Sequence, residues 1–220
     1  MNLFNNIYKG KRVFITGHNG FKGSWLTAWL KMLGAEIYGF SLPNNEINNH
    51  WKSLNTTIKS DFEGNILDSH IFNTKLKEAN PHIIFHLAAQ PLVRRSYVDP
   101  SNTWETNLMG TLNLLESSRY LNSLEAIVIV TSDKCYLNED ERKVFNELDS
   151  LGGHDPYSAS KAAVEILTAS YRKSFFNLEG TPLIASARAG NVIGGGDWAV
   201  DRIVPDLVRS IKIMRFWKYG

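Results

Sequence analysis

The sequence predicts an α/β fold in which helices flank a doubly wound parallel sheet. Short runs rich in β-branched and aromatic residues alternate along the chain with longer segments whose apolar residues recur at helical spacing. Glycines at positions 17, 20 and 23 stand between the first such run and the first helical segment. Alternating strands and helices build parallel sheets, and a glycine-rich turn after the first strand is typical of a dinucleotide-binding site.

The first strand is expected over Arg12–Thr16 and the first helix over Ser24–Leu33. In the turn between them, Gly17 can make the tight bend, Gly20 lets backbone amides approach a pyrophosphate, and Gly23 lets the helix lie close to the strand. The spacing is G-x-x-G-x-x-G, one residue wider in its first gap than G-x-G-x-x-G, and it indicates a variant of the Rossmann site. Glycine-rich segments are also often simple turns, so this motif needs support from the rest of the chain.

The second strand, expected over Ala35–Leu42, lacks a residue that NAD sites usually have. An acidic side chain near the end of this strand commonly binds the adenosine ribose, but Ser41-Leu42-Pro43 occupies the region. The strand therefore does not distinguish NAD from NADP. His18, in the glycine-rich turn, is interpreted as a variable, solvent-facing loop residue near the phosphates.

The chain then continues the same alternation. Pro81–Gln90 is predicted as a strand that ends in small residues, which leave room for a ligand. His86 within it is interpreted as a core histidine rather than as a ligand or an acid. The other expected elements are loops over Asn44–Asn55, Leu137–Asp155 and Gly190–Trp198, strands over Ile58–Phe62, Glu125–Thr131 and Thr181–Arg188, and helices over Ser101–Tyr120, over Pro156–Phe176 and from a cap at Asp68 to Asn80.

Composition restricts the possible functions. With 220 residues and 43% hydrophobic content, the chain can bury one good core, and its net charge of +2 gives no strong attraction to nucleic acid or membranes. No apolar run has the length of a membrane span, and the first residues lack the order of a signal peptide, so we expect a cytoplasmic protein. The single Cys135 agrees with a reducing compartment, and we expect no metal site.

Two groups of polar residues indicate chemistry. Ser132, Asp133 and Lys134 follow a nearly continuous apolar strand, where open α/β sheets bind ligands. Tyr157 and Lys161 are four residues apart near a helix start, so they share one face, and a nearby ammonium would lower the pKa of the phenol. An ordinary surface pair is the alternative, because Y-x-x-x-K is common by chance.

Several motifs together resemble the extended short-chain dehydrogenase/reductase family, and within it the CDP-glucose 4,6-dehydratases. The resemblance runs from about Lys11 to about Ser210. The broader family is indicated by Thr16-Gly17-x-x-Gly20-x-x-Gly23, His86-Leu87-Ala88-Ala89-Gln90, Asn107-x-x-Gly110-Thr111 and Tyr157-x-x-x-Lys161, and the narrower one by Gly20 to Trp25, Gln90 to Arg94, Thr131 to Tyr136 and Arg188 to Trp198.

The resemblance implies a set of site residues. The catalytic group would be Ser132, Asp133, Lys134, Tyr157 and Lys161. The cofactor, NAD, would be bound by Gly17, Asn19, Gly20, Phe21, Gly23, Asn65, Ile66, Leu87, Ala88, Ala89, Tyr157 and Lys161, and the nucleotide sugar by Gln90, Arg94, Asn191 and Arg202. Asn65 stands where relatives usually have an aspartate, and for Arg94 and Arg202 a solvated surface charge is an equal alternative.

The implied reaction converts CDP-glucose to CDP-4-keto-6-deoxyglucose and water by internal hydride transfer. Tyr157, helped by Lys161 and Ser132, would take the proton of the 4-hydroxyl, and Asp133 would protonate the departing 6-hydroxyl. Lys134 stands where the related dTDP-glucose enzymes have a glutamate base, and it could remove the C5 proton only if it were neutral, which burial would favour. The partner would be a small nucleotide sugar, with a homodimer formed through the helices over 101–120 and 156–176.

The domain organisation is expected to be a dinucleotide-binding domain over residues 1–195 and the beginning of a truncated substrate domain over 196–220. The last ten residues, from Ile211 to Gly220, match nothing expected of the family and indicate a truncated or frame-shifted product. Two other functions remain open: a sugar epimerase on the same scaffold, against which Asp133-Lys134 argues, and a catalytically inactive dinucleotide-binding remnant.

Overall fold

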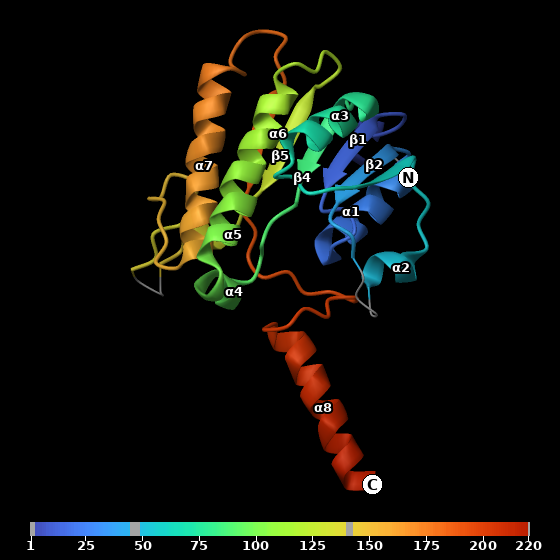
Figure 1. The fold of residues 1–220 in the computed structure, drawn as a ribbon, viewed down its shortest axis with the longest axis vertical. Helices are drawn as coiled ribbons and strands as arrows, with labels where there is room; N and C mark the ends of the chain where they lie inside the picture. The colour runs from blue at the N-terminus through green and yellow to red at the C-terminus, as the bar shows by residue number, and fades with distance from the viewer. Residues whose placement is uncertain (1–2, 45–48, 140–142, 220) are drawn as a thin grey trace.

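The structure is a computed structural model that describes residues 3–44, 49–139 and 143–219, with side chains as far as residue 211. Its sheet has six parallel strands in the order β3-β2-β1-β4-β5-β6 (Figure 1). The strands are β1 Arg12–Thr16, β2 Glu36–Ser41, β3 Ser60–Glu63, β4 Ile83–His86, β5 Ala126–Val130 and β6 Leu183–Ala187. The strand order reverses between β1 and β4, and the crevice beyond their carboxyl ends is where open sheets bind ligands. The doubly wound Rossmann fold is therefore confirmed.

Helices cover both faces of the sheet. Figure 1 shows α5 and α6 following one another along one helical stretch with α7 beside it, while α8 extends away from the sheet. The helices are α1 Phe21–Met32, α2 His50–Leu54, α3 Ser69–Ala79, α4 Val93–Val98, α5 Pro100–Trp104, α6 Gly110–Ser118, α7 Pro156–Ser174 and α8 Ile203–Tyr219, with a π-helical turn η2 at Glu105–Met109 and short 3₁₀ turns η1 at Leu3–Asn6 and η3 at Asp133–Cys135. Among the described residues, no helix is both long and apolar enough to cross a membrane.

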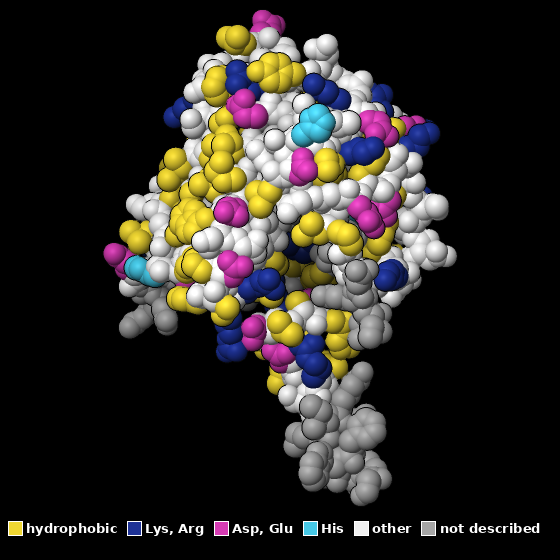
Figure 2. Space-filling view, viewed as in Figure 1, with side chains coloured by type: hydrophobic (Ala, Val, Ile, Leu, Met, Phe, Trp, Pro, Cys, Tyr) yellow, Lys and Arg dark blue, Asp and Glu magenta, His cyan; other side chains and the backbone are white. Residues whose placement is uncertain are grey.

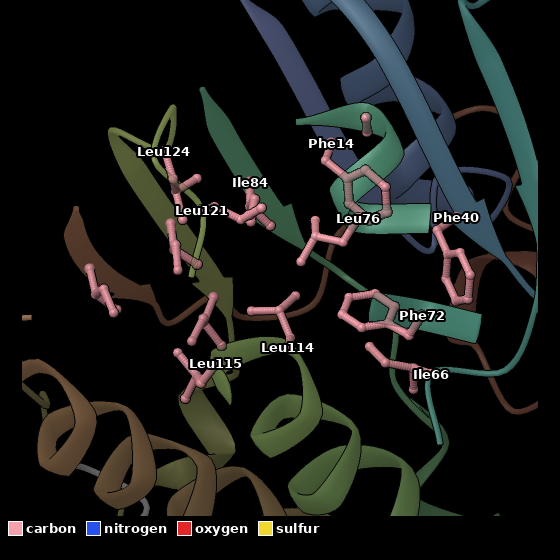
Figure 3. Packing of buried hydrophobic residues seen from close by; sticks show 14 of the residues in the cluster. Phe14, Phe40, Ile66, Phe72, Leu76, Ile84, Leu114, Leu115, Leu121 and Leu124 are labelled. Carbon is pink, nitrogen blue, oxygen red and sulfur yellow. The ribbon is translucent and has the colours of Figure 1, made fainter. Parts of the chain in front are cut away.

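Alternating side chains of the strands form two hydrophobic clusters. Phe14 of β1 packs on one face with Phe40 and Phe72, whose rings lie 5.1 Å apart, centroid to centroid (Figure 3). Val13 and Ile15, its neighbours in β1, pack on the other face beneath α1. Because successive strand residues point to opposite faces, one fully buried strand stabilises both layers.

Most elements agree with the sequence prediction, including their caps. Asp68 accepts a hydrogen bond from the backbone N–H of Ile71 and caps α3, as expected. The helix predicted over Ser101–Tyr120 is present as α5, η2 and α6. The π turn η2 carries Asn107, whose side chain accepts from the Gln90 amide at 2.8 Å and donates to the Ser160 hydroxyl at 2.9 Å.

Some boundaries and two short helices were not predicted correctly. Helix α1 begins at Phe21, three residues before the expected Ser24, because the helix starts inside the glycine motif itself. Helix α2 lies within the expected loop Asn44–Asn55, of which residues 45–48 are outside the described residues, and Asn49 caps it by accepting from the Trp51 amide. Helix α4 was likewise missed, and the segment after Ser210 continues α8 as far as Tyr219. Short helices carry too few turns to produce a periodic pattern.

Candidate active site

The three motif glycines are required for different reasons. Gly17 has φ of +71°, and a Cβ there would lie 2.9 Å from the backbone nitrogen of Ala88. At Gly23, a Cβ would lie 2.0 Å from the carbonyl oxygen of Gly17, so α1 could not approach the turn. Gly20 precedes α1 without a capping side chain, and a Cβ there meets only an ordinary contact at 3.4 Å. This open helix start forms a cradle that fits an anionic pyrophosphate.

His18 is buried, contrary to the expected solvent-facing position. Its side chain is fully inaccessible, with Nδ1 2.8 Å from the Ser41 hydroxyl and its ring edge-on to Trp51. Its Nε2 lies 2.8 Å from an Asp61 carboxylate oxygen, at an ion-pair distance without hydrogen-bond alignment. Burial lowers the pKa of His18, opposed by the charge of Asp61. Ser41, at the end of β2, therefore contacts His18. The imidazole ring of His18 fits beside β2 because Gly39 has no side chain.

The end of β4 is held by hydrogen bonds inside the core. The Thr16 hydroxyl oxygen accepts from the backbone amides of Leu87 and Ala88, each at 3.1 Å. It also lies 2.7 Å from Nδ1 of His86, whose Nε2 lies 3.0 Å from the Thr111 hydroxyl. Both nitrogens of His86 thus have partners in the core, which confirms its interpretation as a core histidine, but the partners are threonine hydroxyls and not the expected backbone groups.

His86 is expected to make stability depend on pH. Burial and then the charge of Lys161 lower its pKa to about 3, from 6.5 for an ordinary histidine. As the pH falls from 6.5 toward 3, the unfolded chain binds a proton that the native state excludes, so His86 reduces the free energy of unfolding by up to about 1.4 kcal/mol per pH unit. Urea unfolding of the His86→Gln variant should show a shallower decline over this range than the wild type. Substitution of the exposed His70 by Gln is the control, and equal slopes for wild type and His86→Gln would contradict the expectation.

Tyr157 and Lys161 are buried at the start of α7. Asp155 caps this helix by accepting from the Ser158 amide at 3.0 Å, which places Tyr157 in the first turn. The Lys161 ammonium donates to the Val130 carbonyl at 3.3 Å, and burial together with the charge of Lys22 lowers its pKa to about 8. The pKa of Tyr157 is raised by burial, although a hydrogen bond with Ser132 opposes the shift. The expected lowering of this pKa is therefore wrong for the protein without ligands, because desolvation exceeds the stabilisation of the phenolate.

Two further cations converge on this pair. Arg202 lies close enough to influence the pKa values of both Tyr157 and Lys22, and its Nε is buried without a hydrogen-bond partner among the described residues. The pKa of Lys22 is lowered by burial and then by the charge of Arg202. Sequence reasoning included Arg202 but missed Lys22, although Lys22 lies inside the glycine motif. A group of cations with an unsatisfied donor is suited to bind an anion.

Ser132, Asp133 and Lys134 lie where β5 ends in the turn η3. The Ser132 hydroxyl donates to the Asp133 carboxylate at 3.0 Å and accepts from the Lys134 amide at 3.2 Å. Asp133 and Lys134 are exposed, so the burial on which a base role for Lys134 depends is not present here. Both residues face a cavity of about 360 Å³, which is also lined by Val93, Tyr136, Asn138, Phe145, Gly153, His154, Asp155 and Ser158.

The other residues expected to bind the cofactor differ in their burial and hydrogen bonding. Asn19 donates to the Leu42 carbonyl at 2.8 Å, which joins the glycine turn to the segment after β2. The Asn65 side-chain oxygen accepts from the Leu67 amide at 3.0 Å, so it is already engaged in a local turn. Ile66 is 5% exposed and packs in the core against Gly110.

The expected substrate residues also differ in environment. Gln90 is turned inward, where its amide donates to Thr103 at 2.9 Å and accepts from the Leu92 amide at 2.7 Å. Arg94 is 81% exposed and pairs with Asp201 at 2.8 Å, which connects α4 to the segment before α8. Asn191 is exposed on the glycine-rich loop. Substrate contact by Gln90 would require it to exchange its present hydrogen bonds.

The glycine-rich loop after β6 is attached to α1. Trp25 donates from its indole nitrogen to the Gly195 carbonyl at 2.9 Å, and its ring lies 4.8 Å from the ring of His50. Gly194 approaches Phe21, and a Cβ at Gly196 would lie 2.2 Å from the His50 ring. The aromatic residues that follow the glycine motif therefore determine where the second glycine-rich loop lies.

Comparisons with known proteins give consistent results. The family model described as GDP-mannose 4,6 dehydratase matches residues 14–214, somewhat past the end of the motif resemblance. CDP-glucose 4,6-dehydratase of Salmonella typhimurium is 46% identical over an alignment of 214 residues, and the match covers 94% of this chain and 59% of that protein. The epimerase Mth375 of Methanothermobacter thermautotrophicus superposes with a TM-score of 0.79 at 29% identity, over 93% of this chain and 59% of that one.

A UDP-glucose 4-epimerase of Thermus thermophilus, solved in complex with NAD, superposes with a TM-score of 0.73 at 29% identity, over 86% of this chain and 58% of that one. The chain thus spans just under three fifths of the length of these relatives.

Proposed function

The chain belongs to the GDP-mannose 4,6 dehydratase family, and from that membership we propose that it is the cofactor-binding part of an NAD-dependent lyase that dehydrates CDP-glucose at C4–C6. The observation that supports the proposal most directly is the buried Tyr157–Lys161 pair, with Ser132 close enough to influence the pKa of Tyr157 and itself hydrogen-bonded to Asp133. The choice of the cytidine nucleotide is supported by the 46% identity to CDP-glucose 4,6-dehydratase.

NAD fits the residues that are present. The backbone cradle at Gly17 and Gly20 leaves space at the start of α1, where side chains would block a pyrophosphate. The buried Nε of Arg202, which has no partner among the described residues, and the nearby Lys22 provide positive charge for the diphosphate of the nucleotide sugar, because NAD has no phosphate beyond its pyrophosphate. When bound, NAD would take up a hydride from C4 of the hexose and return it at C6.

Side chains of this protein would transfer the protons in the proposed dehydration. Tyr157 would accept the proton of the 4-hydroxyl, helped by the nearby Ser132, which favours the phenolate by lowering the pKa of Tyr157. Lys161 would stabilise, by its positive charge, the phenolate form of Tyr157 that accepts this proton. Asp133 would protonate the departing 6-hydroxyl, and loss of that water together with the C5 proton leaves the 5,6-alkene. Lys134 is proposed to remove the C5 proton and to return a proton to C5 when the hydride is delivered to C6. This role requires the substrate to cover its now exposed side chain.

A homodimer through the helices over 101–120 and 156–176 is part of the proposal. Trp104, Met109 and Ile166 on these helices are between 37% and 61% exposed. Figure 2 shows hydrophobic side chains exposed over the face formed by α5 and α6. Exposed apolar residues grouped on one face are typical of a protein–protein interface.

The purified chain is expected to form a 4-keto-6-deoxy sugar nucleotide from CDP-glucose in the presence of NAD. The product is measured by its absorbance in base, and UDP-glucose and dTDP-glucose serve as comparisons for nucleotide preference. An epimerase would instead return a hexose that keeps its 6-hydroxyl, which product analysis by mass distinguishes as the absence of water loss. Binding of NAD without any turnover would contradict catalysis by this chain.

A further inference from the structure

We propose that the ion pair of the buried Glu165 with the partly exposed Arg188 is the positioning element of the candidate site: it holds the end of β5, and with it Ser132 to Lys134, against the helix that carries Tyr157 and Lys161. This inference rests on the proposed function and adds to it two residues that would contact neither cofactor nor substrate. Glu165 lies one helical turn after Lys161 in α7, and its side chain is 4% exposed.

The Glu165 carboxylate joins three elements. One oxygen accepts a hydrogen bond from the hydroxyl of Thr131, the residue directly before Ser132. The other accepts from the Ser186 hydroxyl in β6 at 2.7 Å and from the Arg188 guanidinium at 3.1 Å. The side chain of α7 thus binds the carboxyl ends of β5 and β6 at the same time.

The Arg188 side of the pair reaches the segment that follows Lys134. Its guanidinium lies 4.8 Å from the centre of the Tyr136 ring, which stacks on Phe145. The backbone beside Arg188 adds two hydrogen bonds, from the Thr131 amide to Ala187 at 2.9 Å and from the Asp133 amide to Ala189 at 3.1 Å. The segment from Thr131 to Tyr136 is therefore held at both ends by contacts that meet at this ion pair.

An ion pair with one buried and one largely covered charge is a costly way to hold a fold together, because the charges lose most of their hydration. An apolar pair of similar volume would serve stability equally well, but it would lack the directed hydrogen bonds to Thr131 and Ser186. It would also lack the negative charge one turn from Lys161. The arrangement therefore supplies orientation and charge to the neighbouring polar groups.

The test compares Glu165→Gln and Arg188→Met by NMR titration of Lys161 in the ligand-free chain. The charged and titratable groups around Lys161 include Lys22 of α1, His86 of β4, and Tyr157 and Glu165 of α7 itself. Loss of the Glu165 charge should move the Lys161 titration down by roughly one pH unit, whereas loss of Arg188 leaves that charge less compensated and should move it up. Opposite shifts cannot arise from a general loosening of the core. Arg188→Lys keeps the positive charge and should titrate like the wild type.

Hydrogen exchange measures the positioning itself. The amides of Thr131 and Asp133 should exchange about tenfold faster in Glu165→Gln, because their segment is released from α7. Glu116→Gln is the matched control: this carboxylate also binds α7, through the Tyr171 hydroxyl, but far from the site, and it should change neither amide. Thr131→Val removes one hydrogen bond without leaving a charge unpaired, so it provides the same exchange test if Glu165→Gln does not fold.

The outcomes separate the two proposals. An unchanged Lys161 titration in Glu165→Gln, or shifts in the same direction for both variants, would overturn the positioning role, as would unchanged exchange at Thr131 and Asp133. Both readouts are made without substrate. If they change as expected while the wild-type chain makes no product from CDP-glucose, only the proposed catalytic function fails.

Discussion

Replacement of Gly23 by alanine is expected to destabilise the whole chain and to remove NAD binding. The new Cβ would lie 2.0 Å from the Gly17 carbonyl oxygen and 2.8 Å from the Cα of His18, and both contacts are with backbone that cannot rotate away. Helix α1 would have to move off the sheet, which would also disturb the core formed by Val13 and Ile15. We expect a loss of roughly 3 kcal/mol in the free energy of unfolding, measured by urea denaturation.

Gly20→Ala is the matched variant in the same turn. Its backbone has φ of −76°, and the added methyl group meets only the 3.4 Å contact, so its stability should stay within about 0.5 kcal/mol of the wild type. The methyl group would, however, stand at the start of α1 where a pyrophosphate approaches. A ligand that binds only the folded state raises the melting temperature, so NAD should stabilise the wild type and fail to stabilise Gly20→Ala. Equal stabilisation of the two by NAD would contradict the placement of the cofactor at this turn.

The glycine turn also shows how much of the fold the sequence could predict. Long apolar runs and glycines at fixed spacing are local sequence patterns, so they can be recognised without the structure. The strand predicted from them over Arg12–Thr16 and the doubly wound fold were both confirmed. The motif resemblance likewise placed the chain in a family that the comparisons confirm. His18 was misplaced because its burial depends on Gly39 and on Ser41, which β2 brings beside it only in the folded sheet. Contacts between elements distant in the sequence leave no periodic signal.

Some residues of the candidate site could likewise be predicted from the sequence, and others could not. Tyr157 and Lys161 could be found because they are four residues apart on one helix, and the structure places both of them in a buried position. Lys22 could not be distinguished by spacing, since its importance arises from its closeness to Arg202, far along the chain. The direction of the Tyr157 pKa shift was also wrong, because the desolvation of a side chain depends on everything packed around it.

Tyr157→Phe is expected to reduce conversion of CDP-glucose by a factor of about 10² to 10⁴, the usual contribution of a positioned general base. The variant keeps the buried ring, so the chain should fold as the wild type does. Tyr171→Phe is the control on the same helix: that phenol donates to Glu116 at 2.5 Å, outside the candidate site.

The ligand-free pKa of Tyr157 sharpens this expectation. Burial favours the neutral phenol, so a base role requires ligand binding or the nearby cations to offset the desolvation. The Lys161→Met variant removes one of those cations and should therefore reduce conversion as Tyr157→Phe does, while the double variant should be little worse than either alone, because the two residues act as a unit. If the rate loss of the double variant instead equals the product of the two single losses, the two residues do not act as a unit. That result, or a Tyr157→Phe rate close to that of the wild type, would assign the proton transfer to another group.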